Sequence, residues 1–177
     1  GMVRSRTTAG HERSFIRIIQ PIHTSLGNGT MGWLLPRANE VPHLSLSVDV
    51  DFSHKLLPRR IVSGAINDED FINQVAVART FTFKDDYDML LKDGLAGGGS
   101  MDNAVLYDES GLPMNPSGLR VEYEHAWHKM LDCVGDLTLA GLPIDGHYHA
   151  VKPGHGLNIS MIQSMMKNKD KVQIVHS

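Results

Sequence analysis

The sequence predicts an α+β fold, a two-layer sandwich in which a mostly antiparallel or mixed sheet carries helices packed on one face. Segments with strand character fill the first half of the chain, whereas strands and helices are mixed in the second half. The 177 residues are 41% hydrophobic and 21% charged, which supplies enough apolar material for one domain with a sizeable core. We therefore expect residues 14–177 to form a single domain and residues 1–13 to form a flexible arm.

The strands of the first half are expected where β-branched and other apolar residues recur between polar ones. These segments are residues 14–19, 32–36, 43–52 and 59–66. In the third segment, leucines and valines occupy every second position and would face one side, while serines and aspartates would face the other. That alternation predicts a sheet with one covered face.

The helices are expected from capping residues, apolar periodicity and glycine stops. They run from Asn67 or Asp68 to about Ala78, over residues 84–93 before Gly94, from about Val121 to Ala140 before Gly141, and over residues 155–167. A strand is expected after the glycine-rich turn at residues 94–99, and another over residues 142–151. The glycine-rich turn lacks the Lys-Ser/Thr pair of a phosphate-binding loop, so we interpret it as a backbone bend.

Composition excludes several classes of protein. The net charge of −3 gives no reason to expect nucleic-acid binding. Cys133 is the only cysteine, so neither an internal disulfide nor a thiolate metal cluster is expected. No apolar run approaches the roughly 20 residues of a membrane span, and no signal peptide is evident, so a soluble cytoplasmic protein is expected. Gly1 before Met2 is typical of a removed expression tag, which makes Met2 the expected start.

The helix expected over residues 121–140 carries a polar stripe. With about 100° per residue, His125, His128, Lys129, Asp132 and Asp136 fall within about 100° of one another, and the apolar residues fall on the opposite side. His128 and Asp132 are four residues apart, so both side chains can reach one point. Imidazole and carboxylate both bind zinc, but a catalytic zinc normally takes three protein ligands. By itself, this pattern is more often a hydrogen-bonded surface pair than a metal site.

Several motifs resemble those of one enzyme family. In chain order they are ARTFTF, GGSMDNAV, GLR, HKMLD, GDL and KPGHGLN. From about Ser14 to about Met166 the chain resembles UDP-3-O-acyl-N-acetylglucosamine deacetylases, the zinc amidases of lipid A biosynthesis. That family has two domains of similar α+β design with zinc and substrate between them, and this chain resembles the second domain.

The resemblance implies a role for each matching residue. His128 and Asp132 would bind zinc. His155 would stabilise developing charge or protonate the leaving amine, Asp136 would orient it, and Thr80 would donate to the oxyanion. The substrate would be of the UDP-3-O-acyl-glucosamine type. Lys129 would bind its phosphates, and Asp51 and Phe52 would contact its uridine. Met101 and Ala104 would contact its acyl chain, and Lys152 would be a further contact.

The family's third zinc ligand and its glutamate base come from an adjacent Glu-His pair in the first domain, which we do not find here. His11 and Glu12 have the reverse order and no helical surroundings, so they are not interpreted as a substitute. His125, His147 and His149 crowd the matching region. One of them would be available as a third ligand, but we favour the interpretation that they face solvent.

Departures from the family pattern put substrate fit in doubt more than fold. Trp127 stands where the family usually has arginine, and Thr82 stands where it usually has glycine. His125 replaces an apolar residue. His149 and Val151 replace threonine and tyrosine. Three functions therefore stay open. The first is the zinc-binding part of a deacetylase that works with a separate first domain. The second is a non-catalytic module that binds UDP-sugars or acyl chains. The third is a metal-binding protein whose site is completed by a second copy of the chain.

Overall fold

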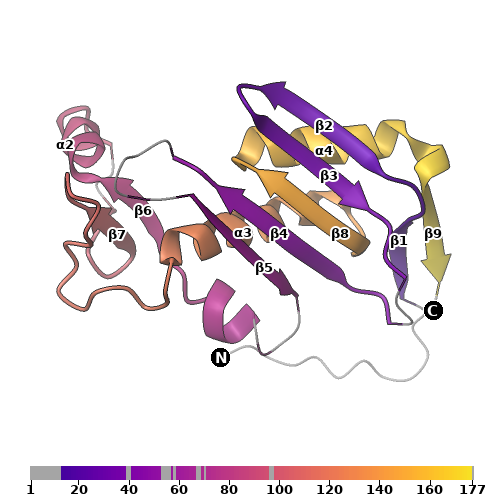
Figure 1. Ribbon diagram of the computed structural model, residues 1–177, viewed down its shortest axis with the longest axis horizontal. Coiled ribbons are helices and arrows are strands. Elements are labelled where there is room, and N and C mark those ends of the chain that lie inside the picture. Colours follow the sequence, from indigo (N-terminus) through magenta and orange to yellow (C-terminus); the bar gives the residue numbers. More distant parts are fainter. Residues whose placement is uncertain are drawn as a thin grey trace.

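The computed structural model describes residues 13–38, 41–52, 57, 59–66, 69, 71–95 and 98–176. Its main feature is a seven-stranded mixed sheet (Figure 1). The strands are β1 (Ser14–Ile18), β2 (Ile22–Gly27), β3 (Thr30–Leu35), β4 (Leu44–Val50), β5 (Arg60–Ala65), β8 (Ile144–Val151) and β9 (Val172–His176). The predicted α+β fold class is confirmed.

Strand β8 lies at the centre of the sheet. On one side it pairs in parallel with β4, which in turn pairs with β5 in antiparallel fashion. On the other side, β1 pairs in parallel with the first two residues of β8, and β3 pairs antiparallel with the remainder. Strands β2 and β9 extend the sheet beyond β3 and β1, both antiparallel. Gly146 permits this crowding, because a Cβ there would lie 2.8 Å from a side-chain carbon of Ile18.

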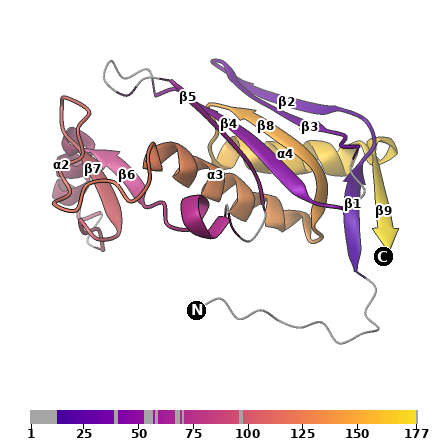
Figure 2. The ribbon, with the colours of Figure 1, turned by 60° about the horizontal axis from the view of Figure 1, so that its bottom comes forward.

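Helices α3 (Glu124–Leu137) and α4 (His155–Lys167) cover one face of the sheet (Figures 1 and 2). The core lies between these layers, where alternate strand residues meet the apolar sides of the helices. Its fully buried members include Ile22, Leu34, Leu46, Val48, Tyr148, Met130, Cys133 and Met161. The alternation predicted for residues 43–52 is therefore observed, with the leucines and valines of β4 under the helices.

A small subdomain projects from one end of this body (Figure 1). It contains the parallel pair β6 (Thr80–Phe83) and β7 (Ala104–Tyr107), and α2 (Lys84–Lys92). A separate apolar cluster of Leu57, Val105 and Tyr107 holds it together. Helix α2 has no buried residue, so its apolar side chains face outward in this part of the chain.

Most predicted elements are confirmed, with corrections at one helix and three strands. Gly94 and Gly141 have φ values of 71° and 82°, as expected of residues that end helices. The helix expected from residue 67 or 68 to Ala78 is instead the five-residue π-helix η1 (Phe71–Val75), and its predicted caps lie outside the described residues. Strands β2, β6 and β9 were not predicted. None of the helices in the described part of the chain is long and apolar enough to cross a membrane.

Candidate active site

The candidate site follows the polar stripe of α3. His128 and Asp132 lie one turn apart, with 3.6 Å between His128 Nδ1 and Asp132 Oδ2. Both side chains are 18% exposed, so they are neither in bulk solvent nor sealed in the core. Lys129 approaches the same carboxylate, with Nζ 3.7 Å from Oδ2. The structure therefore brings together the two predicted metal ligands and the lysine beside them.

The surroundings of His128 favour its neutral form. Burial lowers the pKa of His128, the charge of Asp132 opposes that effect, and the charge of Lys129 adds to it. The net direction is downward, so the imidazole is uncharged at neutral pH. A neutral imidazole has a lone pair free for a metal ion, whereas a protonated one has none.

The donor pair fits zinc as two parts of a larger set. Ligand atoms about 2.1 Å from a tetrahedral zinc ion lie about 3.4 Å apart, and the observed separation of 3.6 Å is close to that spacing. Nitrogen and carboxylate oxygen are also ligand types that zinc accepts. Within the described residues no group of three or more His, Cys, Asp or Glu side chains is arranged to hold a metal. The stripe thus offers two ligands of a site.

His125 does not belong to the open part of the stripe, although the helical wheel placed it there. Its side chain is buried, and its Nδ1 lies 3.0 Å from the hydroxyl of Tyr107. The rings of Phe52, Phe81 and Tyr107 surround it at centroid distances of 5.8–5.9 Å. Burial lowers the pKa of His125 to about 4, which keeps it neutral. The interpretation of His125 as a solvent-facing residue is corrected.

His147 and His149 lie on the face of the sheet that the helices leave open. Their neighbours on β8, Tyr148 and Ala150, point into the core beneath the helices, so the alternating positions point away from α3. His147 is hydrogen-bonded to Ser45, and the ring of His149 lies 5.5 Å from that of Trp33. The structure does not bring these histidines to the His128–Asp132 pair.

His155 begins α4 and meets the last polar residue of the α3 stripe. Its Nδ1 lies 2.8 Å from Oδ2 of Asp136, and its side chain is 70% exposed while that of Asp136 is 17% exposed. The hydrogen bond and charge of Asp136 raise the pKa of His155. Among the groups around His155, the carboxylate of Asp136 has the largest effect on its pKa. An exposed imidazole with a raised pKa can carry a proton near neutral pH.

An aromatic wall borders the other end of the stripe. The ring of Phe81 lies 6.5 Å from that of His128 and 5.0 Å from that of Phe52. Lys129 Nζ is 5.8 Å from the centre of the Phe81 ring, which is within reach of a cation–π interaction. Phe52, a predicted substrate contact, is thereby placed beside the predicted metal ligands. Phe81 was not singled out from the sequence.

Asp51 and Lys152 come together at the ends of two neighbouring parallel strands. Lys152 Nζ lies 3.2 Å from Oδ2 of Asp51, and its backbone N–H donates to the carbonyl of Asp49. Lys152 has a φ of 50°, a left-handed conformation that is unusual outside glycine. These two predicted substrate contacts form one polar group immediately after β4 and β8.

Thr80 and Met101 belong to the subdomain. Thr80 opens β6 with an exposed side chain, directly before Phe81 of the aromatic wall. Met101 lines a cavity of about 40 Å³ with Thr82, Ala104 and other residues. A cavity of this volume is too small for an acyl chain. The roles of Thr80 and Met101 stay predictions.

The subdomain is fastened to α3 by a buried ion pair that sequence reasoning missed. Glu124 accepts hydrogen bonds from the backbone N–H and the guanidinium of Arg79 and from the backbone N–H of Arg120. Arg79 also donates to the carbonyls of Met101 and Gly118. Burial alone raises the pKa of Glu124, but the bonds from Arg79 and Arg120 outweigh it and the pKa is lowered. Arg79 directly precedes Thr80, so this pair sets where β6 begins.

Cys133 takes no part in the open stripe. Its side chain is buried, and burial raises the pKa of its thiol to about 12. Cys133 Sγ lies 3.5 Å from Oδ1 of Asn158. Cys133 is therefore a small packing residue of the core.

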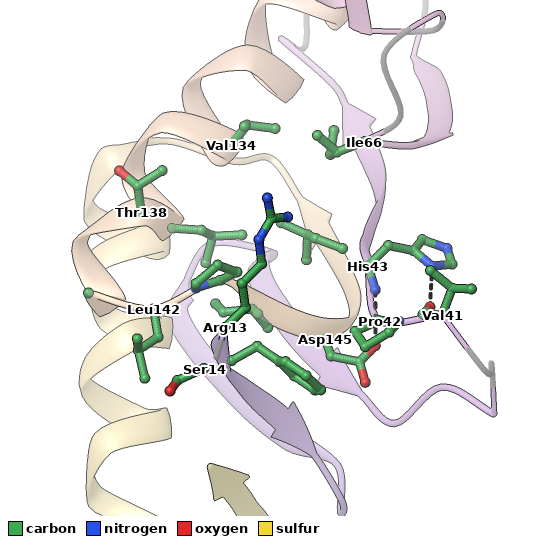
Figure 3. Close-up of a pocket in the computed structure, with 16 residues that line it drawn as sticks. Arg13, Ser14, Val41, Pro42, His43, Ile66, Val134, Thr138, Leu142 and Asp145 are labelled. Carbon is green, nitrogen blue, oxygen red and sulfur yellow. Dashed lines mark hydrogen bonds between the residues drawn. The ribbon is translucent and has the colours of Figure 1, made fainter. Parts of the chain in front are cut away.

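A larger cavity lies elsewhere in the molecule. It has a volume of about 710 Å³ and opens beside Arg13, between the end of α3 and the starts of β1, β4 and β8 (Figure 3). Its walls are mainly apolar, and the carboxylate of Asp145 is bonded to the backbone N–H of His43 and to Arg17. None of the predicted site residues lines it. A separate groove of about 400 Å³ beside β5 is lined by Tyr123 and Trp127.

Comparisons with known proteins agree on one family. A family model described as UDP-3-O-acyl N-acetylglycosamine deacetylase matches residues 3–167. The chain is 36% identical over 162 residues to a UDP-3-O-acyl-N-acetylglucosamine deacetylase of Geobacter sp. (strain M21), covering 92% of this chain and 51% of that protein. Proteins of the same name from Myxococcus xanthus and Syntrophotalea carbinolica are 38% and 40% identical over 75% of this chain and 42% of theirs. The chain thus spans about half the length of the curated relatives it matches.

Proposed function

The chain belongs to the UDP-3-O-acyl-N-acetylglucosamine deacetylase family, and we propose that it supplies one side of the active site of a zinc-dependent deacetylase of lipid A biosynthesis. The reaction is hydrolysis of the substrate's acetamide: water adds to the carbonyl carbon, the C–N bond breaks, and acetate and a free amine leave. The observation that carries this proposal is the arrangement on α3, where His128 and Asp132 share a stripe with the Asp136–His155 pair.

The metal would be held by His128 and Asp132 together with ligands from outside the described residues. Zinc at this position would polarise the amide carbonyl and acidify a bound water. The neutral state of His128 and the 3.6 Å spacing of the donor atoms support this assignment. The matched relatives are about twice as long as this chain. We assign the third ligand and the glutamate base to the part of such a protein that lies outside the match.

His155 would provide the proton for the leaving amine. Its raised pKa keeps a proton on the ring near neutral pH, and its exposed position allows contact with a substrate. Asp136 would orient the ring and stabilise its charged form. Thr80 would donate its hydroxyl hydrogen to the oxyanion that forms when water adds.

The substrate would lie along the stripe and the aromatic wall. Phe52 and the Asp51–Lys152 pair would contact the uridine end, since ring stacking and paired polar groups suit a nucleoside. Lys129 would bind the phosphates. Met101 and its neighbours in the subdomain would contact the acyl chain, and the outward apolar residues of α2 lie in the same subdomain.

A second candidate function follows because the described residues offer only two ligands for a metal ion. A chain that offers two metal ligands among its described residues can serve as a binding module for UDP-sugars or acyl chains without hydrolysis. It can also complete its metal site with a second copy. UDP binding without deacetylation, or a dimer that forms only with zinc, would favour these alternatives.

Metal analysis separates the candidates first. Mixed with a protein that carries the first domain of the family, the chain is expected to retain zinc after dialysis, and His128→Ala in the same mixture is expected to lose it. His147→Ala is the matched control, because it removes a histidine of similar burial on the opposite face of the sheet. Equal zinc content in all three proteins would contradict the assignment of His128.

Activity and substrate binding are measured next. Addition of a protein that carries the first domain of the family is expected to give deacetylation of UDP-3-O-acyl-N-acetylglucosamine that disappears in His155→Ala. Calorimetry with UDP is expected to show binding that weakens in Phe52→Ala and Lys129→Ala but not in His147→Ala. Deacetylation that survives loss of both His128 and His155 would rule out the proposed mechanism.

A further inference from the structure

Asn158 joins the Asp136–His155 pair to the core of the molecule. It lies in the first turns of α4 and is fully buried. Its Nδ2 donates to Oδ2 of Asp136 at 2.8 Å, the same oxygen that meets Nδ1 of His155 at 2.8 Å. Its Oδ1 accepts from the hydroxyl of Tyr148, also fully buried, at 3.0 Å. A continuous chain of polar groups thus runs from the sheet to the exposed imidazole.

The orientation of the Asn158 amide is determined by the carboxylate of Asp136. The Tyr148 hydroxyl and the Cys133 thiol both converge on one atom of the Asn158 amide. Both groups can donate to a carbonyl oxygen, so the amide oxygen suits that position. A flipped amide would place its oxygen 2.8 Å from the carboxylate of Asp136, with no hydrogen between two acceptors. The amide nitrogen therefore faces Asp136.

The ordered amide constrains Asp136 in turn. Two donors on the same carboxylate oxygen hold that oxygen in one place, because rotation of the carboxylate would break both bonds. An ionised carboxylate only accepts hydrogen bonds, so the His155 nitrogen that faces it must carry a hydrogen. Uncharged His155 is then the Nδ1–H tautomer, and Nε2 on the other side of the ring is left for other partners.

We propose that Asn158 is a positioning residue that acts through Asp136 to hold His155 in its Nδ1–H tautomer, with Nε2 as the atom that exchanges protons with substrate. The assignment of the tautomer stands on the geometry alone, and its catalytic consequence rests on the proposed function. Tyr148 supports the same role from the core, since its hydroxyl orients the Asn158 amide. Without Asn158, Asp136 is free to turn toward solvent and the imidazole loses its fixed acceptor.

The tautomer can be observed directly in the chain. Multiple-bond ¹H–¹⁵N correlation spectra of zinc-free, ¹⁵N-labelled protein at alkaline pH distinguish the two ring nitrogens of neutral His155. Wild-type protein is expected to show the Nδ1–H form, and Asn158→Leu is expected to show mostly the Nε2–H form, which unconstrained histidine side chains favour. Asp136→Asn, which removes the acceptor's charge, serves as the positive control for loss of the constraint.

A matched control separates positioning from general loss of stability. Asn115 is also a buried amide that makes several hydrogen bonds, but it lies in the subdomain. Asn115→Leu is expected to lower stability and to leave the His155 tautomer unchanged. If Asn158→Leu folds and keeps the Nδ1–H form, the proposal is wrong. If that variant does not fold, the wild-type spectrum still decides, because an Nε2–H form there would overturn the proposal.

Kinetics test the catalytic consequence separately. In an active preparation, Asn158→Leu is expected to lower kcat by about 10-fold with little change in KM, as is typical when the partner of a working side chain is removed. An unchanged kcat together with a changed tautomer would limit Asn158 to a structural role. If no preparation deacetylates the substrate, the proposed function fails while the tautomer result stands.

Discussion

Two charged pairs at opposite ends of α3 use similar chemistry in different surroundings. Near its start, Glu124 and Arg79 have side chains that are 0% and 2% exposed. Near its end, Asp136 and His155 have side chains that are 17% and 70% exposed. In both pairs one carboxylate accepts several N–H donors. The difference lies in what remains free once those bonds are made.

At the first pair both carboxylate oxygens and all three guanidinium nitrogens make hydrogen bonds within the described part of the chain. Glu124 accepts from Arg79 and Arg120, and the Arg79 guanidinium also donates to carbonyls of the subdomain. At the second pair one side of the carboxylate is held by Asn158, while the His155 ring extends into solvent. A closed pair can only hold elements together, whereas a pair anchored on one side can exchange a proton. The Arg79–Glu124 pair therefore differs from the Asp136–His155 pair in solvent exposure and in how the carboxylate is held, more than in residue type.

The largest change in the free energy of unfolding is expected from breaking the buried Arg79–Glu124 pair. Glu124→Gln removes the charge opposite Arg79 and leaves a buried guanidinium without its counter-ion, which should lower the free energy of unfolding by about 3–5 kcal/mol. Asp136→Asn is the comparison, because His155 is exposed to water and an amide oxygen can still accept from Asn158, so the change should cost about 1 kcal/mol or less. Urea denaturation of both variants measures the difference. A smaller loss in Glu124→Gln than in Asp136→Asn would refute the contrast between the two pairs.

The two pairs also differ in how far sequence reasoning reached them. His128, Asp132 and Asp136 share one side of α3 as the helical wheel placed them, because their relative directions follow from helical periodicity alone. At the start of α3 the same wheel placed His125 in the open stripe. There the subdomain folds over the helix, and rings from Phe81 and Tyr107, far away in sequence, bury it.

The same reason explains the other successes and omissions. Core strands with clear alternation and helices with glycine stops were predicted, since both signals are local. Arg79 and Asn158 were missed because their importance depends on partners 45 and 22 residues away, Glu124 and Asp136. The position of Arg79 directly before Thr80 in the ARTFTF motif is the signal in the sequence that could have drawn attention to it. For Asn158 the KPGHGLN motif contained the residue but not its partners.

An intermediate change in the free energy of unfolding is expected when the pH is lowered, because His125 is buried in its neutral form. Its folded-state pKa of about 4 lies below the ordinary 6.5, so the unfolded chain binds an extra proton between these values. Its contribution to stability is complete above about pH 6.5 and is lost as the pH falls toward 4. The loss should reach on the order of 3 kcal/mol once the pH is below the folded-state pKa of about 4. Urea denaturation across this pH range measures it.

His125→Phe isolates that contribution. Phenylalanine keeps an aromatic ring among Phe52, Phe81 and Tyr107 but cannot be protonated. The variant should lose much of the acid dependence in this range, while at neutral pH it gives up only the hydrogen bond with the Tyr107 hydroxyl, about 1 kcal/mol. An acid dependence as steep as that of the wild type would show that other groups are responsible.

The smallest effect is expected from a pair that is open on both sides. Lys84 and Asp88 lie one turn apart on α2, with 2.6 Å between Nζ and Oδ2 and side chains that are 43% and 45% exposed. Water solvates each partner when the other is removed, so Asp88→Asn should lower the free energy of unfolding by about 0.5 kcal/mol or less. Urea denaturation at low and high salt measures this, and the difference should shrink as salt screens the charges. A loss comparable to that of Glu124→Gln would mean that burial does not determine the strength of these pairs. A small, salt-sensitive loss would complete a series in which the contribution of an ion pair falls as its exposure rises.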